Sequence, residues 1–249
     1  MTQVFDFTLG PPIGEQATLG VIVLQSDETL EHDFRRLLPE RGVALYTSRI
    51  PSGAEVSTDS LAEMEAEMPR AAGLLPRPVR FDAVGYGCTS GTSVIGAERV
   101  AELVKSGCRT EAVTEPLSAL LAACRHLDIH RLAFLSPYVE AVSAHLRNVL
   151  ARGGVETPVF GSFDEAEETR VARIDGGSIK AAARALMADG DADALFMSCT
   201  NLRTLDVISE IEAEIGKPVL SSNQVLAWDL LRRAGVRCHH DGFGRLFHA

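Results

Sequence analysis

Short apolar runs alternate with amphipathic stretches along the whole chain. The runs are too short for helices and nearly continuous in apolar residues, as in strands that are buried on both faces. Strands are predicted over Leu19–Leu24, Val43–Tyr46, Phe81–Tyr86, Glu111–Val113, Arg131–Leu135, Val159–Phe160, Ala194–Met197 and Val219–Leu220. Helices are predicted over Glu28–Leu38, Ser60–Ala71, Thr92–Ser106, Leu117–Leu127, Val139–Ala151, Ser178–Ala188, Leu205–Ile215 and Val225–Ala234. This alternation predicts an α/β fold with parallel sheets covered by helices.

An internal duplication divides the chain into two halves. Asp82–Ser90 aligns with Asp193–Asn201, which places Cys88 and Cys199 at equivalent positions 111 residues apart. Upstream, Phe34, Leu38, Gly42 and Val43 align with Leu146, Leu150, Gly154 and Val155 at nearly the same offset. Such a repeat predicts two similar Rossmann-like halves related by a pseudo-twofold axis, with the active site in the cleft between them. The halves are assigned to residues 15–115 and 116–221, and residues 222–249 are expected to pack back on the first half.

Composition excludes several classes of function. The 249 residues carry a net charge of −10, and no cluster of lysine and arginine is long enough to follow a phosphate backbone, so no nucleic-acid partner is expected. No apolar run approaches the roughly 20 residues that span a bilayer, so no membrane association is expected. The segment Met1–Gly14 lacks the features of a signal peptide, which predicts a cytoplasmic protein.

The five cysteines are widely spaced and odd in number, so they are expected to be thiols in a reducing compartment. No Cys and His grouping has the spacing of a zinc site. The nearest approach, the run Cys238–Asp241, is interpreted as a surface tail, because adjacent side chains rarely converge on one ion. We therefore expect no metal.

Two cysteines stand where ligands bind in parallel α/β sheets, just beyond the carboxyl ends of strands. Cys88 and Cys199 each follow a predicted strand and are expected to precede a helix N-terminus, which favours the thiolate. Nearby backbone amides and polar side chains are expected to bind a substrate carboxylate. These candidate side chains are Thr89, Ser90, Thr200 and Asn201. Two thiols facing one cleft, roughly 6–10 Å apart, suit proton removal from one face of a molecule and delivery to the other.

Other interpretations of these residues carry less weight. A lone cysteine at a strand end is more often a small buried apolar residue, and this interpretation is given to Cys108, Cys124 and Cys238. The glycines around Cys88 are spaced as G-x-G-x-x-x-G, a weak match to a dinucleotide-binding loop with no acidic partner in the expected place. We therefore expect no organic cofactor.

The segments Tyr86–Thr92 and Ser198–Arg203 resemble the two cysteine motifs of the aspartate/glutamate racemase superfamily. The resemblance is closest to its branch of maleate cis–trans isomerases and arylmalonate decarboxylases, together with the ectoine-utilisation proteins of that branch. The decarboxylase retains only the second cysteine, so the presence of both favours isomerisation or racemisation. The resemblance also implies a homo-oligomer, a dimer or larger.

Two further residues gain a role from this resemblance. Tyr138 is similar to a family tyrosine that hydrogen-bonds a substrate carboxylate, although an ordinary loop tyrosine is an equal alternative. Asp27 stands where maleate isomerases have a carboxylate-binding asparagine, and Glu167 and Glu168 lie where a later asparagine is expected. Acids in place of amides favour a substrate that carries an ammonium group. For Asp27, capping of the following helix is an alternative that does not exclude substrate binding.

Three functions therefore remain open. The first is a cofactor-independent two-cysteine isomerase or racemase of a small carboxylate, such as an amino acid derivative from ectoine degradation. The second is maleate cis–trans isomerase, with Cys88 as nucleophile and Cys199 as proton donor. The third is a binding or redox-sensing relative without catalytic activity.

Overall fold

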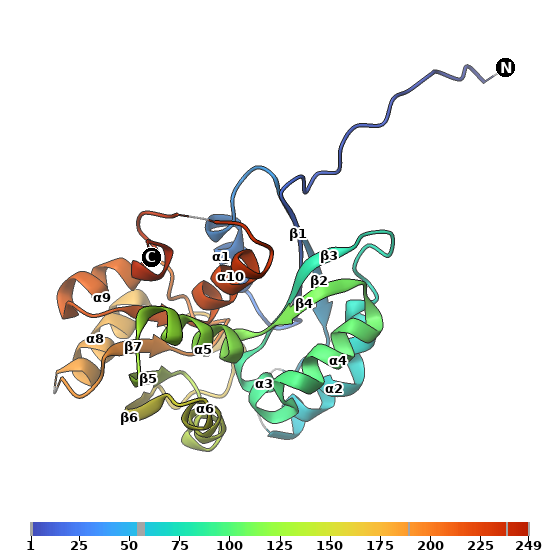
Figure 1. Ribbon diagram of the computed structural model, residues 1–249. Coiled ribbons are helices and arrows are strands. Elements are labelled where there is room, and N and C mark those ends of the chain that lie inside the picture. Colours follow the sequence, from blue (N-terminus) through green and yellow to red (C-terminus); the bar gives the residue numbers. More distant parts are fainter. Residues whose placement is uncertain (1, 54–57, 189, 238, 249) are drawn as a thin grey trace.

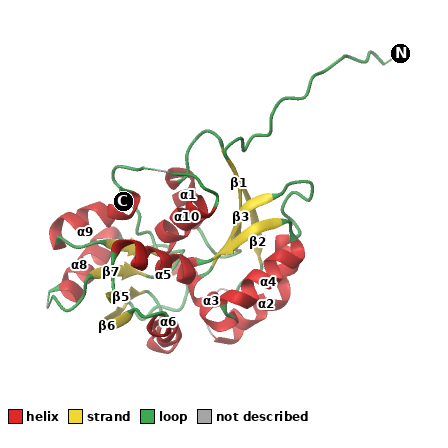
Figure 2. Ribbon diagram, in the orientation of Figure 1, coloured by secondary structure: helices red, strands yellow, loops and turns green. Residues whose placement is uncertain are grey.

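Parallel strands form two four-stranded sheets in the computed structural model, which describes residues 2–53, 58–188, 190–237 and 239–248 (Figures 1 and 2). The first sheet has the order β2-β1-β3-β4, with β1 at Ala17–Leu24, β2 at Val43–Ile50, β3 at Phe81–Gly87 and β4 at Thr110–Thr114. The second has the order β6-β5-β7-β8, with β5 at Arg131–Ser136, β6 at Glu156–Ser162, β7 at Ala194–Met197 and β8 at Val219–Ser221.

Helices cover both sheets, as the apolar strands require. Before β5 they are α1 (Leu30–Leu37), α2 (Thr58–Ala72), α3 (Thr89–Ile95), α4 (Ala97–Gly107) and α5 (Pro116–Leu127). After β5 they are α6 (Glu140–Arg152), α7 (Glu168–Val171), α8 (Gly176–Met187), α9 (Ile208–Ile215) and α10 (Ser222–Arg233), followed by a 3₁₀ turn at Arg245–Phe247. The α/β fold class is confirmed.

The duplication seen in the sequence is a duplication of structure. Both sheets have the same strand order, with the first strand of each half next to the second and the third. The aligned glycines are also equivalent, because Gly42 and Gly154 have φ angles of +79° and +83° in the turns before β2 and β6. A left-handed backbone at both positions explains why glycine recurs there.

Two helices each follow the last strand of one sheet and pack against the other sheet. Helix α10 packs against β3, β4 and α1 of the first half, and Leu226 and Leu230 lie so close to Gly85 that a methyl group there would approach Leu230 Cδ1 to 3.1 Å. The Thr114 hydroxyl of β4 donates a hydrogen bond of 2.6 Å to Asp229 of α10. Conversely, apolar residues of α5 share a core with β5 and β7 of the second sheet. The two halves are therefore joined through interleaved helices (Figure 1).

Two predicted segments differ from the structure. The single helix expected over Thr92–Ser106 is two helices, because the chain turns at Gly96 with φ of +93° and α3 already begins at Thr89. The acidic and polar sequence of Gly161–Arg170 predicts a loop, whereas the segment contains the end of β6 and the start of the short helix α7.

Residues 2–16 extend away from both sheets (Figure 1). Large apolar side chains of this segment are 72–89% exposed, namely Val4, Phe5, Phe7, Leu9 and Ile13. Within the described residues, no helix has both the length and the apolar character needed to cross a membrane.

Candidate active site

The two repeated cysteines meet in one small cavity between the halves. Cys88 directly follows β3 and Cys199 lies just beyond β7, which are equivalent third strands of the two repeats. The cavity is lined by Leu24, Cys88, Thr89, Ser90, Tyr138, Glu168, Cys199 and Thr200. Its volume of about 20 Å³ is room for about one water molecule. The structure therefore shows the site in a closed form that must widen to admit a substrate.

Cys88 is the N-cap residue of α3. Its Sγ accepts a hydrogen bond of 3.1 Å from the Gly91 amide, as expected for a thiol at a helix N-terminus. Burial nevertheless raises the pKa of Cys88 to about 12, with the negative charge of Glu168 adding to this and the Gly91 amide opposing it. The helix N-terminus thus favours the thiolate at this position, as expected, while desolvation opposes it.

Cys199 has a different local geometry from Cys88. The sequence predicts a helix starting close behind it, but α9 begins only at Ile208. Its φ angle is +98°, which is uncommon for a residue with a side chain and costs on the order of 1–3 kcal/mol. The Cys199 amide donates to Ser222 Oγ at 3.0 Å and the Asn201 amide donates to Cys199 Sγ at 3.2 Å. These contacts hold the strained backbone and aim the thiol into the cavity.

The predicted hydroxyl residues gather here but differ in their hydrogen bonds. Ser90 Oγ is buried and has no hydrogen-bond partner among the described residues, so it is free to bind a ligand. Thr89 Oγ1 donates to Ser222 Oγ at 2.8 Å, and Thr200 Oγ1 donates to the Gly87 carbonyl at 3.3 Å. Ser222, which sequence reasoning missed, therefore links the two cysteine motifs.

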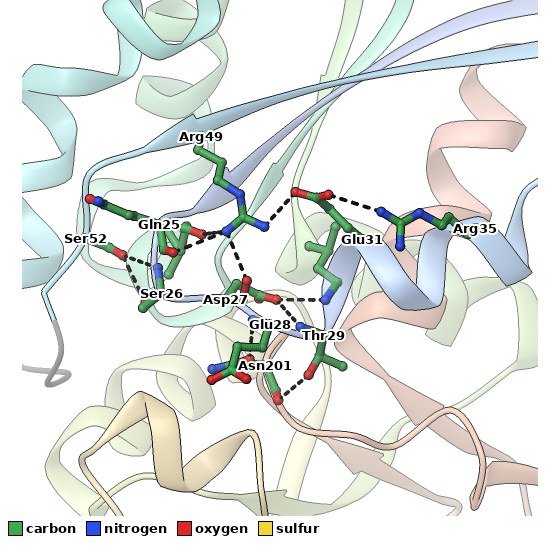
Figure 3. A network of polar contacts seen from close by, with 12 residues as sticks. Gln25, Ser26, Asp27, Glu28, Thr29, Glu31, Arg35, Arg49, Ser52 and Asn201 are labelled. Atoms are coloured by element: carbon green, nitrogen blue, oxygen red, sulfur yellow. Dashed lines mark hydrogen bonds and ion pairs between the residues drawn. The ribbon is translucent and has the colours of Figure 1, made fainter.

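Asp27 does not line the cavity, and it begins the segment that leads into α1 (Figure 3). Its Oδ1 accepts hydrogen bonds of 2.8 Å from the amides of Thr29 and Leu30, as predicted for a capping residue. Its Oδ2 is buried without a hydrogen-bond partner in the described part of the chain, although Thr200 lies against the carboxyl group. Burial raises the pKa of Asp27. One oxygen thus binds the first amides of the α1 segment, and the other is buried beside Thr200.

Glu168 is the second acid of the site, and it lines the cavity directly. Tyr138 Oη donates to Glu168 Oε1 at 2.6 Å and lies 2.9 Å from Cys199 Sγ. Asn201 Nδ2 donates to Glu168 Oε2 at 2.7 Å, while Asn201 Oδ1 accepts from the Glu28 amide at 2.8 Å. The Asn201 amide is therefore engaged with protein groups in this closed form. The sequence signal for Glu168 was its place in the acidic segment after β6.

The electrostatics of the site are dominated by acids. Burial raises the pKa of Glu168, and the negative charge of Asp27 raises it further. Burial also raises the pKa of Cys199 well above its usual value, and the charges of Glu168 and Asp27 act in the same direction. Among the described residues, no lysine, arginine or histidine lines the cavity. Burial and the two acids therefore favour the protonated thiols, and no described cationic side chain lines the cavity to oppose them.

The other candidate ligands lie elsewhere. Cys108 and Cys124 are free thiols that do not line the cavity, and Cys238 lies outside the described residues. His239, Asp241 and His248 bring ligand atoms within 4.8 Å of one another on the exposed C-terminal segment. None of these three residues lines the cavity.

Comparison with known proteins assigns this architecture to a family. The sequence profile of arylmalonate decarboxylase matches residues 96–247, more than half of the chain. The chain therefore belongs to the arylmalonate decarboxylase family. Within curated proteins, this family member is 28% identical to a maleate isomerase of Nocardia farcinica, over 92% of this chain and 94% of that protein. It is 33% identical to the arylmalonate decarboxylase of Bordetella bronchiseptica over 52% of this chain and 55% of that one.

Solved structures give the same picture for this family member. A cysteine-to-serine mutant of the Nocardia farcinica maleate cis–trans isomerase, with a covalently bound succinylcysteine intermediate, superimposes with a TM-score of 0.84 at 26% identity. The match covers 93% of this chain and 98% of that one. A liganded double mutant of arylmalonate decarboxylase gives a TM-score of 0.78 at 26% identity, covering 93% and 98% of the two chains.

Proposed function

We propose that this chain is a cofactor-independent isomerase in which Cys88 and Cys199 act on opposite faces of a small carboxylate. The observation that carries this proposal is that the duplicated thiols converge on one closed cavity. One thiol, once ionised, takes a proton from the carbon next to the carboxylate, and the other thiol gives its proton to the opposite face. The net change in protons is zero, so the reaction is a racemisation or isomerisation.

The acids of the site indicate that the substrate also carries an ammonium group. Asp27 has a buried oxygen without a partner, Glu168 lines the cavity, and no described cationic side chain lines it. A buried carboxylate is costly unless a cation or several hydrogen-bond donors face it. An ammonium group on the substrate supplies both. The ectoine-degradation intermediate suggested by the resemblance is one molecule of this class and stays a prediction, as does the homo-oligomer.

Maleate cis–trans isomerisation is the second candidate, and the similarity to a maleate isomerase over 92% of the chain favours it. In this reaction the Cys88 thiolate adds to the double bond, Cys199 protonates the neighbouring carbon, and rotation precedes elimination. A dianionic substrate can bind beside Asp27 and Glu168 if these acids are protonated. Burial raises the pKa of both acids, which makes such protonation easier.

Two assays on the intact protein separate these functions. Racemisation of an amino carboxylate exchanges its Cα proton for deuterium in heavy water, which nuclear magnetic resonance detects. Maleate isomerisation changes the ultraviolet absorbance of a maleate solution as fumarate forms, without exchange of an amino acid. Cys88→Ala is the control for both assays. A protein that shows neither activity but forms a Cys88–Cys199 disulfide on oxidation would contradict the proposal and support a redox-sensing role.

A further inference from the structure

A continuous chain of hydrogen-bonding groups connects one thiol of the site to a buried acid. Cys199 Sγ lies 2.9 Å from Tyr138 Oη, which donates to Glu168 Oε1 at 2.6 Å. All three residues are at most 4% exposed. The Asn201 amide fixes the other carboxylate oxygen of Glu168 at 2.7 Å, so the acid cannot turn away without breaking that contact.

The described structure does not show such a connection to a buried acid at Cys88. Cys88 Sγ accepts a hydrogen bond from the Gly91 amide, which cannot take a proton from it. The tyrosine beside Cys88 is Tyr86, whose hydroxyl faces Met64 Sδ at 3.5 Å rather than a carboxylate. Each half therefore has a tyrosine beside its cysteine, but the two tyrosines are not equivalent in the repeat, because Tyr86 aligns with Met197. In the described structure the buried acid is hydrogen-bonded to Tyr138.

Few waters compete with this connection in the resting site. The cavity has room for about one water molecule, whereas the Tyr138 hydroxyl lies directly against Cys199 Sγ. A thiol that must lose a proton before it acts as a base, and regain one afterwards, therefore has a proton acceptor beside it within the protein.

We propose that Glu168 is a proton reservoir for Cys199, reached through the Tyr138 hydroxyl. This role rests on the proposed two-thiol function. In the forward direction the Cys199 S–H bond breaks and its proton passes to Tyr138 Oη, while the Tyr138 proton passes to Glu168 Oε1. The products are a Cys199 thiolate, a neutral tyrosine and a neutral carboxylic acid, and the reverse transfer restores the resting site. Cys199 is then the thiol that ionises first, and Cys88 begins the cycle as the proton donor.

The physical state of Glu168 suits this exchange. Burial and the nearby charge of Asp27 raise its pKa, so the carboxylate is a stronger base than one in water. The negative charge of Glu168 also raises the pKa of both thiols. Removing that charge would by itself lower the pKa of both thiols and so favour their thiolates. A simple charge effect and a proton reservoir therefore predict changes of opposite sign at Cys199.

Peroxide oxidation of the substrate-free protein distinguishes these signs. Hydrogen peroxide is a small probe that oxidises thiolates, and peptide mass spectrometry separates the two cysteines. In Glu168→Gln we expect the oxidation rate of Cys199 to fall about tenfold, because its proton acceptor is lost. Cys88 should be oxidised faster in the same sample, because a repelling charge is gone. Glu167→Gln, which alters the exposed neighbouring acid, should change neither rate.

Faster oxidation of both cysteines in Glu168→Gln would overturn the reservoir and leave only a charge effect. Tyr138→Phe tests the same connection without altering the acid, and it should also slow Cys199. With an active substrate, Glu168→Gln should lower kcat more than it changes KM, and it should shift the pH profile of kcat. The double variant that combines Glu168→Gln with Tyr138→Phe should be no slower than the slower of the two single variants. If the wild type turns over no substrate, the proposed function fails, whereas the peroxide result still decides whether Glu168 serves Cys199.

Discussion

Replacing Asp27 with asparagine removes one buried charge from the site without removing the start of α1. Asp27 Oδ1 accepts from the Thr29 and Leu30 amides at 2.8 Å each, and an asparagine side-chain oxygen can accept the same bonds. Asparagine caps helices about as well as aspartate. Because burial raises the pKa of Asp27, the charged carboxylate destabilises the folded protein near neutral pH. The free energy of unfolding should therefore stay unchanged or rise in Asp27→Asn.

The effect on ligand preference should be large. Two charges about 4 Å apart interact by about 4 kcal/mol at an effective dielectric constant near 20, before desolvation is subtracted. At about 1.4 kcal/mol for each factor of ten, even a third of this energy changes affinity about tenfold. We therefore expect Asp27→Asn to weaken binding of an amino carboxylate about tenfold or more. Maleate should bind more tightly by a similar factor, because its repulsion by Asp27 is gone.

Inhibition constants of maleate, measured in wild type and variant, test this expectation. Glu28→Gln is the matched control, because Glu28 is the next residue, is exposed, and forms an ion pair with Arg173 at 3.0 Å. Water screens that charge, so its removal should leave maleate inhibition nearly unchanged. Equal inhibition of wild type and Asp27→Asn would show that Asp27 only caps the helix. An equal shift in Glu28→Gln would assign the effect to net charge.

Other expectations follow from different parts of the molecule. Cys88→Ser and Cys199→Ser should each lower kcat by about 10² or more with an unchanged circular dichroism spectrum, because a hydroxyl ionises far less readily than a thiol; a near-normal rate would make that cysteine structural. Burial raises the pKa of Asp33 from 3.8 to about 7, so this carboxyl should lower the unfolding free energy by about 4 kcal/mol as pH rises through this interval. Asp27 and Glu168 add to the slope, because burial raises their pKa values too. Asp33→Asn should therefore make the slope shallower in urea titrations, and an unchanged slope would refute the assignment. Leu230→Ala should cost about 2–5 kcal/mol in the same urea assay, because Leu230 is fully buried against the first sheet; a loss below about 1 kcal/mol would contradict the packing of α10.

The fold was predictable because its signals are local and repeated. Each buried parallel strand is a short apolar run, and the aligned Gly42 and Gly154 mark equivalent turns in both halves. The break between α3 and α4 escaped prediction because apolar spacing continues across Gly96, and only its φ of +93° ends the first helix. Hydrophobic periodicity reports which face is buried, whereas it does not report a change of helix axis.

The sequence predicts which residues form the candidate site better than it predicts their protonation states. The repeat alone brings Cys88 and Cys199 together, and the strand-end rule brings their hydroxyl neighbours. The protonation state was not predictable, because it depends on complete burial and on Glu168, which arrives from a short helix outside the repeated motif. Ser222 was missed because its role depends on a contact with Cys199, which lies 23 residues away in the sequence.

The crossing of α10 onto the first sheet has a consequence for how the protein is made. Synthesis proceeds from the N-terminus, so β3 and β4 leave the ribosome long before the helix that covers them. The first half must therefore wait, with apolar strand faces uncovered, until Leu226 and Leu230 are available. The same helix begins with Ser222, which holds Cys199 in its strained backbone. Helix α10 therefore completes the first core and brings Ser222 to Cys199 at the same late stage. A nascent chain that lacks α10 has neither the complete core nor this contact.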